Sequence, residues 1–211
     1  MTGMGEPPAR PVGLRERKKA RTRAAIREHA LRLFREQGYY TTTIEQNADA
    51  AEVSPATFFR YFPTKEDVVL QDDFDVISLG ALAMQPPGLA PIAAFRAAST
   101  ATLASLSEDD LARFRETTEL TMQIPEIRAR AIDEFVRTIN QIADAVALRT
   151  GRDASDFEVR TIAGAIIGVI MSVTVPETSD TFTAEGMADV RDLFARIDQA
   201  LEYLERGLPI S

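Results

Sequence analysis

The chain has 211 residues, of which 45% are hydrophobic and none is cysteine, so it can form a core but no disulfide or thiolate site. Its net charge of −8 argues against nucleic-acid binding over the whole surface. The charge is uneven, however. Residues 1–62 hold 11 Lys/Arg and 7 Asp/Glu, net +4, whereas residues 63–211 hold 13 and 25, net −12. Because phosphate binding depends on local charge, a nucleic-acid surface is expected in the N-terminal part, and the acidic remainder should orient it.

Residues 1–13 are rich in glycine and proline and show no apolar periodicity, which predicts a disordered tail. They also lack the apolar stretch of a signal peptide, so none is expected. A long helix is predicted from Leu14 to Gln37, with Gly38 as its stop. It carries nine Lys/Arg between positions 15 and 35. We expect its basic part to contact DNA phosphates through Arg17, Lys18 and Arg21; the alternative for such a run is a solvated face.

Two short helices are predicted next. Any of the three threonines at 41–43 can cap a helix that runs through Ile44 and Ala51. After a tight turn at Glu52 and Val53, Ser54 can cap a third helix, with Pro55 at its first position and Pro63 after its end. Its exposed side is expected to carry Thr57, Arg60 and Tyr61, the short hydrogen-bonding and cationic groups that read base edges. The pattern predicts a three-helix bundle ending in a helix-turn-helix.

These residues resemble a known family. The run Gly38, Thr42-Thr43-Ile44, Ala48, Ala51, Val53-Ser54, Thr57, Phe59-Arg60-Tyr61-Phe62 and Lys65-Glu66 is similar to the N-terminal domain of TetR-family (tetracycline-repressor-like) regulators. The resemblance implies an all-helical homodimer with an N-terminal DNA-binding domain and a C-terminal domain for ligand and dimer contacts, in which ligand binding releases the DNA. The residues expected to contact DNA are Thr42, Thr43, Ser54, Pro55, Ala56, Thr57, Phe59, Arg60, Tyr61 and Lys65, together with the three cations of the first helix.

Three positions depart from the family pattern. Phe59 stands where a tyrosine hydroxyl usually contacts a phosphate. Tyr61 and Lys65 are therefore expected to make more of the contacts to the DNA backbone. Glu52 stands where glycine is usual, at a cost of roughly 1 kcal/mol if the backbone there is left-handed. Asn47 replaces a branched apolar residue. A buried amide without partners costs about 1–3 kcal/mol, and the alternative is that Asn47 faces a polar pocket or the DNA.

The rest of the chain reads as helices, so the fold class is all-α: a DNA-binding domain over 14–62 and a larger ligand-binding and dimerisation domain over 63–211. A first helix from Thr64 to about Met84 is expected to lead away from the DNA-binding bundle. The other helices are predicted at 91–106, 107–122, 125–149, 155–174 and 184–206, separated by proline, glycine and N-cap signals.

A ligand cavity is expected between the helices over 64–149. Its predicted walls are Phe95, Phe114, Met122, Phe135 and Ile139, and its predicted polar groups are Arg96, Glu119, Arg137 and Asn140. Core packing is the alternative for the former group and a solvated face for the latter. The expected effector is small and apolar. The continuation from Val68 to Asp73 is similar to a subgroup that includes mycofactocin-type regulators, which implies an acyl-CoA-like ligand.

The last two helices have broad apolar faces that suit a four-helix dimer interface, although they could instead close the subunit's own core. A dimer is favoured because a helix-turn-helix normally reads two half-sites of a palindromic operator. The apolar run at 162–175 is shorter than a membrane span, so a cytoplasmic protein is expected. The predicted interface residues are Ile162, Ile166, Val169, Ile170, Val190, Phe194, Ile197 and Leu201.

Other functions are weaker readings. The chain has one histidine, His29, and shows no phosphate-binding glycine loop, no carboxylates at metal-ligand spacing and no nucleophile elbow. We therefore expect no catalytic residue, metal or cofactor, and an all-α enzyme is the remote alternative. The nearer alternative is a constitutive DNA-binding regulator that has no small-molecule effector.

Overall fold

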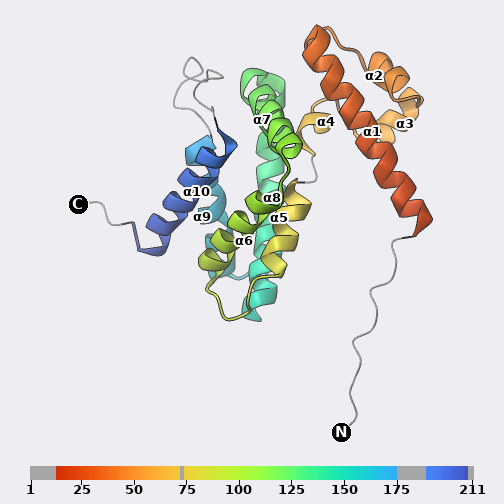
Figure 1. The fold of residues 1–211 in the computed structure, drawn as a ribbon. Helices are drawn as coiled ribbons and strands as arrows, with labels where there is room; N and C mark the ends of the chain where they lie inside the picture. The colour runs from red at the N-terminus through yellow and green to blue at the C-terminus, as the bar shows by residue number, and fades with distance from the viewer. Residues whose placement is uncertain (1–12, 72–73, 175–188, 209–211) are drawn as a thin grey trace. The chain divides into compact units, whose positions relative to one another are not determined.

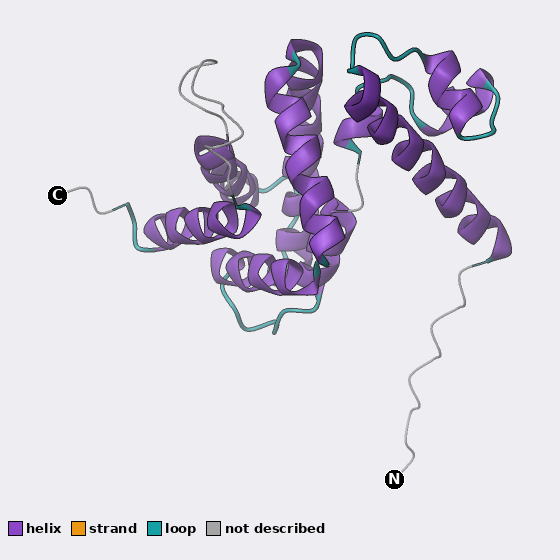
Figure 2. Ribbon diagram, turned by 45° about the horizontal axis from the view of Figure 1, so that its top comes forward, coloured by secondary structure: helices purple, strands orange, loops and turns teal. Residues whose placement is uncertain are grey.

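The computed structural model describes residues 13–71, 74–174 and 189–208 (Figure 1). Within these ranges the chain forms ten α-helices and no strand, as Figure 2 shows, so the predicted all-α class is confirmed. The predicted tail at 1–12 and the predicted start of the last helix at 184–188 lie outside the described residues. The chain forms two compact units, Met1–Val68 and Val69–Ser211, which are described separately.

The first unit contains a long helix and two short ones. α1 (Leu14–Gln37) packs against α2 (Ile44–Ala50), which packs in turn against α3 (Pro55–Tyr61). α4 (Asp67–Leu70) follows, and the boundary between the two units falls within it. Helices of seven residues are not stable alone, so α2 and α3 depend on a shared core. Its fully buried members are Ile26, Ala30, Ala48, Phe58, Phe62 and Val68.

The sequence signals for helix ends operate as local chemistry predicts. Gly38 has a φ of 89°, a conformation that favours glycine, and ends α1. Thr43 caps α2 in a reciprocal arrangement: its hydroxyl accepts from the N–H of Gln46 at 3.2 Å, and its own N–H donates to Gln46 Oε1 at 2.9 Å. Ser54 caps α3 by accepting from the N–H of Thr57 at 3.1 Å. Thr43 thereby fixes the start of α2 and Ser54 the start of α3.

Two of the departures from the family pattern have structural consequences. Glu52 has a φ of 52°, so the turn requires the left-handed backbone that glycine adopts more readily. Asn47 is fully buried, and neither its Oδ1 nor its Nδ2 has a hydrogen-bond partner among the described residues. The alternative that Asn47 faces the DNA is therefore wrong. Both residues destabilise the first unit relative to the usual choices.

Asn47→Leu is expected to stabilise the first unit by about 1–3 kcal/mol, because leucine has the same number of side-chain heavy atoms and no polar group to desolvate. Hydrogen exchange of the amides of α1 and α2 measures the change, since their opening reports local stability. Asp49→Leu, on the exposed side of the same helix, is the control for composition and should give little change. A less stable Asn47→Leu protein would show that the amide has a partner, such as a bound water.

The second unit is a bundle in which α8 packs against α5, α7 and α9, and α10 packs against α6, α7 and α9. The single helix expected from Thr64 to Met84 is wrong: α4 ends at Leu70, Gln71 is not helical, and α5 begins at Phe74. The six helices of this unit are α5 (Phe74–Ala83), α6 (Pro91–Ser105), α7 (Glu108–Gln123), α8 (Pro125–Thr150), α9 (Phe157–Thr174) and α10 (Val190–Glu205).

The core of the second unit lies between α8, α9 and α10. Ile166 of α9 and Leu201 of α10 are fully buried, at 0% accessibility. They belong to the same core cluster as Ile142 and Val146 of α8. Among the described residues, α9 is the one helix whose length and composition would also suit a membrane span. Core helices of globular bundles have the same character. α9 packs against α6, α8 and α10, although only four of its eighteen residues are buried.

Arg149, near the end of α8, holds the connection between α5 and α6. Its Nη1 donates to the carbonyl oxygen of Gln85 at 3.1 Å and its Nη2 to that of Pro86 at 2.6 Å. Longer bonds of 3.4 and 3.3 Å reach the carbonyl oxygens of Leu82 and Leu89. These carbonyls belong to the end of α5 and the loop after it; those of Leu82 and Pro86 also accept from the N–H groups of Gln85 and Leu89, both at 3.2 Å. One guanidinium therefore closes the end of α5.

Candidate nucleic-acid interface and ligand cavity

α3 presents a short polar and aromatic surface. Phe58 and Phe62, four residues apart, are fully buried and fix which side of the helix faces inward. The opposite side exposes Pro55, Ala56 and Arg60, and Phe59 is 49% exposed. The Arg60 guanidinium lies 5.4 Å from the ring centre of the half-buried Tyr61. A helix of this size with one cation and an exposed aromatic ring suits the major groove, where Phe59 can contact a thymine methyl group.

The hydroxyl groups expected at this surface are largely used in the fold. Thr42 is only 2% exposed, and its Oγ1 donates to the carbonyl oxygen of Gly38 at 2.8 Å. Its predicted contact with DNA is therefore wrong. The Thr43 and Ser54 side chains cap α2 and α3, and Ser54 Oγ also donates to Thr57 Oγ1 at 3.0 Å. Thr43 and Ser54 are still exposed at the N-termini of their helices, where backbone N–H groups suit a phosphate.

Lys65 lies in an aromatic site rather than on an open surface. Its ammonium is 4.0 Å from the ring centre of Tyr39 and 5.5 Å from that of Phe34, and it donates to the carbonyl oxygen of Tyr39. Burial lowers the pKa of Lys65, against the opposing effect of the Glu66 carboxylate. Burial alone would raise the pKa of Glu66, but hydrogen bonds, above all from Tyr39 Oη at 2.6 Å, lower it. Lys65 thus supports the bundle.

The exposed cations of the first unit gather on the first half of α1. Arg17, Lys18 and Arg21 are all exposed there, as predicted for phosphate contacts. Near the middle of α1 two arginines turn inward, whereas Arg32 and Arg35 beyond them are exposed. Arg23 lies 5.1 Å from the ring centre of Phe62, and Arg27 Nε donates to the carbonyl oxygen of Val68 at 3.1 Å. The helix therefore offers cations at its start and structural contacts at its middle.

The second unit contains a cavity of about 130 Å³ between its helices. Three phenylalanine rings line one part of it. Phe74 lies 4.9 Å from Phe114 and 5.8 Å from Phe194, and the last two are 6.0 Å apart, measured between ring centres. Such distances are typical of favourable aromatic pairs. The full lining is Phe74, Ser78, Leu79, Leu82, Phe95, Ala98, Ser99, Phe114, Thr138, Gln141, Ile142, Ile170, Thr174, Leu193, Phe194 and Ile197.

The sequence located the cavity only in part. Phe95 and Phe114 line it, as expected, whereas Phe135 and Ile139 pack against the main core and Met122 is buried away from the cavity. The wall residues that sequence reasoning missed include Phe74 and Gln141. A signal was available: Thr138 and Gln141 are three residues apart and share one side of α8 with the buried Ile142.

The polar residues predicted for the cavity are used elsewhere. Arg137 pairs with Glu134 at 2.7 Å, Asn140 Oδ1 accepts from Arg160 at 2.6 Å, and the half-buried Glu119 does not line the cavity. These three predictions are therefore wrong, because each side chain lies on a side of its helix that faces away from the cavity.

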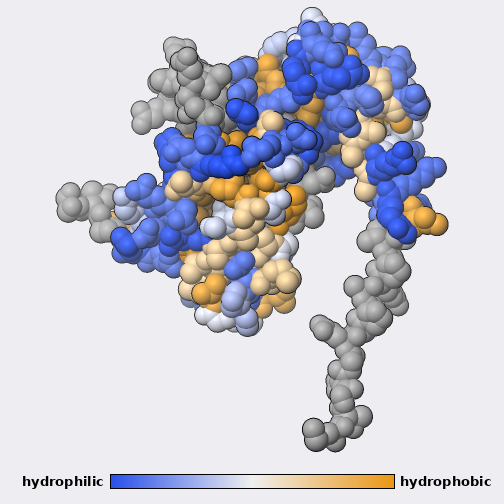
Figure 3. Space-filling view, viewed as in Figure 1, coloured by the Kyte–Doolittle hydropathy of each residue, from blue (hydrophilic) through white to orange (hydrophobic). Residues whose placement is uncertain are grey.

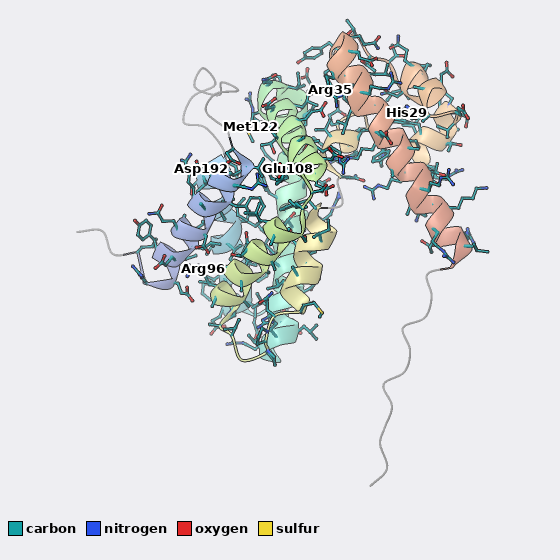
Figure 4. All side chains as sticks on the ribbon, in the orientation of Figure 1. His29, Arg35, Arg96, Glu108, Met122 and Asp192 are labelled. Atoms are coloured by element: carbon teal, nitrogen blue, oxygen red, sulfur yellow. The ribbon has the colours of Figure 1, made fainter. Side chains whose placement is uncertain are left out.

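Arg96 binds the acidic side of α10 instead of a ligand (Figure 4). Its Nε and Nη2 donate to the two carboxylate oxygens of Asp198 at 2.8 and 3.0 Å, and its Nη1 lies 2.9 Å from Glu205. Hydrogen bonding to Asp198 is the largest cause that raises the pKa of Arg96 above its ordinary value. Arg191 of α10 makes a similar link to Glu108 of α7 at 2.7 Å. These pairs tie α10 to its own subunit.

Most residues predicted for a dimer interface lie inside the subunit. Five of them are at most 8% exposed: Ile166, Val190, Phe194, Ile197 and Leu201. The apolar side of α10 packs on α6, α7 and α9, so it is closed to a second copy. Ile170 lines the cavity, and Ile162 and Val169 pack partly on the core. The outer surface of α10 is hydrophilic, as the blue colour at the left of Figure 3 shows.

The open side of the last two helices is on α9. Only four of its eighteen residues are buried. Thr161, Gly168 and Ser172 are exposed, with the half-buried Gly164 and Ala165 between them on the same side of the helix. A Cβ atom added at Gly164 or Gly168 meets nothing within 4 Å. This side, called the small-residue face, allows another helix to approach closely, because interaxial distance depends on side-chain size.

Comparisons with known proteins found matches to both the N-terminal and the C-terminal part of the chain. Residues 26–71 match the model for bacterial regulatory proteins of the tetR family, and residues 89–209 match the model for the MftR C-terminal domain. The chain is 34% identical over 200 residues to the HTH-type transcriptional regulator TcmR of Streptomyces glaucescens, covering 91% of this chain and 81% of TcmR. It is 27% identical over 158 residues to the mycofactocin biosynthesis regulator MftR of Mycobacterium tuberculosis, covering 74% and 79%.

Among solved structures, the chain is similar to FadR of Thermus thermophilus, a repressor crystallised in complex with lauroyl-CoA. The TM-score is 0.55 at 26% identity, and the match covers 90% of this chain and 96% of FadR. SmeT of Stenotrophomonas maltophilia shares the fold at 19% identity with a TM-score of 0.54. On both the N-terminal helix-turn-helix and the C-terminal bundle, this chain belongs to the TetR family of DNA-binding transcriptional regulators.

Proposed function

We propose that this protein is a cytoplasmic repressor that binds a palindromic operator as a homodimer and leaves it when a small apolar effector binds. One observation carries the ligand response: the second unit encloses an apolar cavity of about 130 Å³ whose lining includes the first residue of α5. A well-formed apolar cavity with a few polar groups is the usual form of a small-molecule site.

The cavity is connected through the chain to the DNA-reading helices. Phe74 begins α5 and contacts both Phe114 and Phe194, and only three residues separate it from the end of α4. An effector that displaces the Phe74 ring moves the start of α5, and with it the end of the first unit. The effector shifts the equilibrium only by its difference in affinity for the two states. Because α4 ends at Leu70 and α5 begins at Phe74, we expect the coupling to depend on the start of α5 rather than on one continuous helix.

The small-residue face of α9 supports the homodimer. Among the described residues it is a side of α9 that the subunit leaves partly open, and its small side chains suit a close approach by the same helix of a second copy. Two copies place two α3 helices for the two half-sites of a palindrome, which is how dimeric helix-turn-helix proteins read DNA.

Arg60→Ala is expected to lower the preference for the operator over random DNA by about 1–3 kcal/mol, because the exposed Arg60 is the cation of α3 that can reach base edges. Arg21→Ala is the matched control. It removes a cation from the exposed start of α1 and should weaken both DNAs alike, lowering the salt slope of binding by roughly 1. Fluorescence anisotropy with both DNAs over a series of salt concentrations measures the two effects. If Arg60→Ala weakens binding to the operator and to random DNA equally, Arg60 contacts only phosphates.

The experiment that tests the whole proposal uses the DNA upstream of the protein's own gene. Binding is measured at about 150 mM salt with random DNA as competitor, since affinities without a stated salt concentration have no meaning. Competitor-resistant binding supports the operator-reading function, and binding no tighter than to random DNA at this and at genome-selected sites contradicts it. A library of apolar small molecules is then tested for release of the DNA. Release of the DNA supports the ligand response. If the protein binds the operator tightly and no molecule releases it, the protein is the constitutive DNA-binding regulator.

An acyl-CoA effector is a specific form of this proposal. The FadR relative was crystallised with lauroyl-CoA, and the C-terminal bundle matches the MftR domain. A short acyl group suits the apolar wall and the volume of the cavity, about 130 Å³. The phosphates of CoA would lie outside it, because no cation is among the residues that line it.

A further inference from the structure

Among the residues that the structure describes, the cavity wall has no ionisable side chain. The residues that the structure places around it include no Asp, Glu, Lys, Arg or His. A buried charge without a partner is costly, since desolvation disfavours the charged form strongly. Arg96, the charged residue nearest in sequence to the wall residue Phe95, has its guanidinium bound to Asp198 and Glu205. A ligand that carries a charge into this cavity therefore finds no counterion there.

The volume limits the part of the ligand that fits. At about 130 Å³ the cavity is close to the size of apolar protein cavities of about 150 Å³ that bind benzene. Three phenylalanine rings surround it, and ring–ring contacts add to the energy of burial. The buried part of a ligand that leaves the wall in place is thus about the size of one ring.

Five polar side chains interrupt the apolar wall, and they are not equivalent. Thr138 Oγ1 donates to the carbonyl oxygen of Glu134 at 3.0 Å, and Thr174 Oγ1 to that of Ile170 at 2.8 Å, so both hydroxyl protons are used. Ser78 and Ser99 are short and can bond within their helices in the same way. Gln141, half-buried on α8, has an amide that both donates and accepts.

We propose that the buried part of the effector is an uncharged, ring-sized group bearing a carbonyl or hydroxyl, and that the Gln141 amide hydrogen-bonds to it while the ring packs against Phe74 and Phe114. This inference rests on the proposed ligand response and specifies its chemistry. It distinguishes an uncharged ligand from a carboxylate of the same size. Gln141 is then the residue that sets specificity between polar and purely apolar ligands.

Three probes of one ring test the proposal on the full chain: acetophenone, toluene and benzoate. Their dissociation constants are measured by ligand-observed NMR. The unmodified protein should bind acetophenone about 3- to 10-fold more tightly than toluene, the value of one hydrogen bond, and should not bind benzoate. In Gln141→Met the preference should vanish or reverse, because the amide is lost while the length and apolar contacts of the side chain remain. Gln199→Met, on the exposed side of α10, is the matched control and should keep the original preference.

The outcomes separate this inference from the proposed function, because operator binding is measured on the same samples. Benzoate binding as tight as that of acetophenone overturns the proposal that the buried group is uncharged. An unchanged preference in Gln141→Met overturns the role of Gln141. If no probe binds to a protein that still binds its operator, the inference fails and the DNA-binding function stands. If Gln141→Met does not fold, Gln141→Leu takes its place with the same expected loss of preference.

Discussion

Gly168→Arg is expected to convert the proposed dimer into a 23.2 kDa monomer and to lower operator affinity by about 10²- to 10⁴-fold. Gly168 is exposed on the small-residue face of α9, and a Cβ added there meets nothing within 4 Å in the described part of the subunit. The subunit should therefore fold as before. A second copy, however, would have to approach over a long charged side chain and bury it without a partner. Sedimentation velocity measures the mass, and anisotropy measures the affinity.

The control for this experiment is Gly80→Arg. Gly80 is an exposed glycine inside α5, and a Cβ there also meets nothing within 4 Å. This variant carries the same added charge and the same gain in helix propensity, so it should remain dimeric and bind the operator normally. A Gly168→Arg protein that stays dimeric would place the interface on another side of the molecule, and the dimer proposed through α9 would have to be abandoned.

Arg149→Met is expected to destabilise the second unit by about 3 kcal/mol, because it removes a charged donor from the carbonyl oxygens of Gln85 and Pro86. Methionine keeps much of the apolar stem but removes the charged donor, which leaves the carbonyl oxygens of Leu82 and Pro86 with their backbone N–H partners alone. Leu82, in the last turn of α5, lines the cavity, so loosening of this end should also weaken ligand binding. Urea unfolding followed by circular dichroism measures the stability.

Arg152→Met is the matched control for Arg149→Met. Arg152 lies three residues farther along the chain, and its guanidinium pairs with Asp156 at 2.9 Å and Glu158 at 2.8 Å on the exposed surface. Surface ion pairs contribute little to stability, so this variant should unfold almost as the parent does. Similar stabilities of the two variants would mean that water replaces the Arg149 guanidinium at the carbonyl groups without loss.

The first unit could be predicted closely because its signals are local. Thr43, Ser54 and Gly38 act on backbone groups within a few residues, so their chemistry is legible in the sequence. The resemblance to the family rests on the same residues. The prediction for Thr42 failed because it depends on the fold. Threonine is a polar residue that is common on surfaces, yet the turn after α1 directs the Thr42 hydroxyl inward.

The second unit was harder to predict because an apolar stripe shows which side of a helix is buried but not which helix covers it. The stripe of α10 suited a dimer interface and a subunit core equally well, and the structure uses it for the core. Arg149 binds a carbonyl group 63 residues away in the sequence, and Gln141 lines a cavity formed with other helices, so both placements depend on tertiary packing that periodicity does not report.

The buried amide of Asn47 and the left-handed backbone of Glu52 lie in the unit that reads DNA, next to helices of only seven residues. Multidomain proteins need not unfold in a single step. On heating, we expect the DNA-reading unit to melt before the bundle around the cavity. The protein would then dissociate from the operator while the rest of the molecule is still folded. Modest warming would thus have the same result for transcription as the effector, and the genes under its control would carry a built-in response to heat.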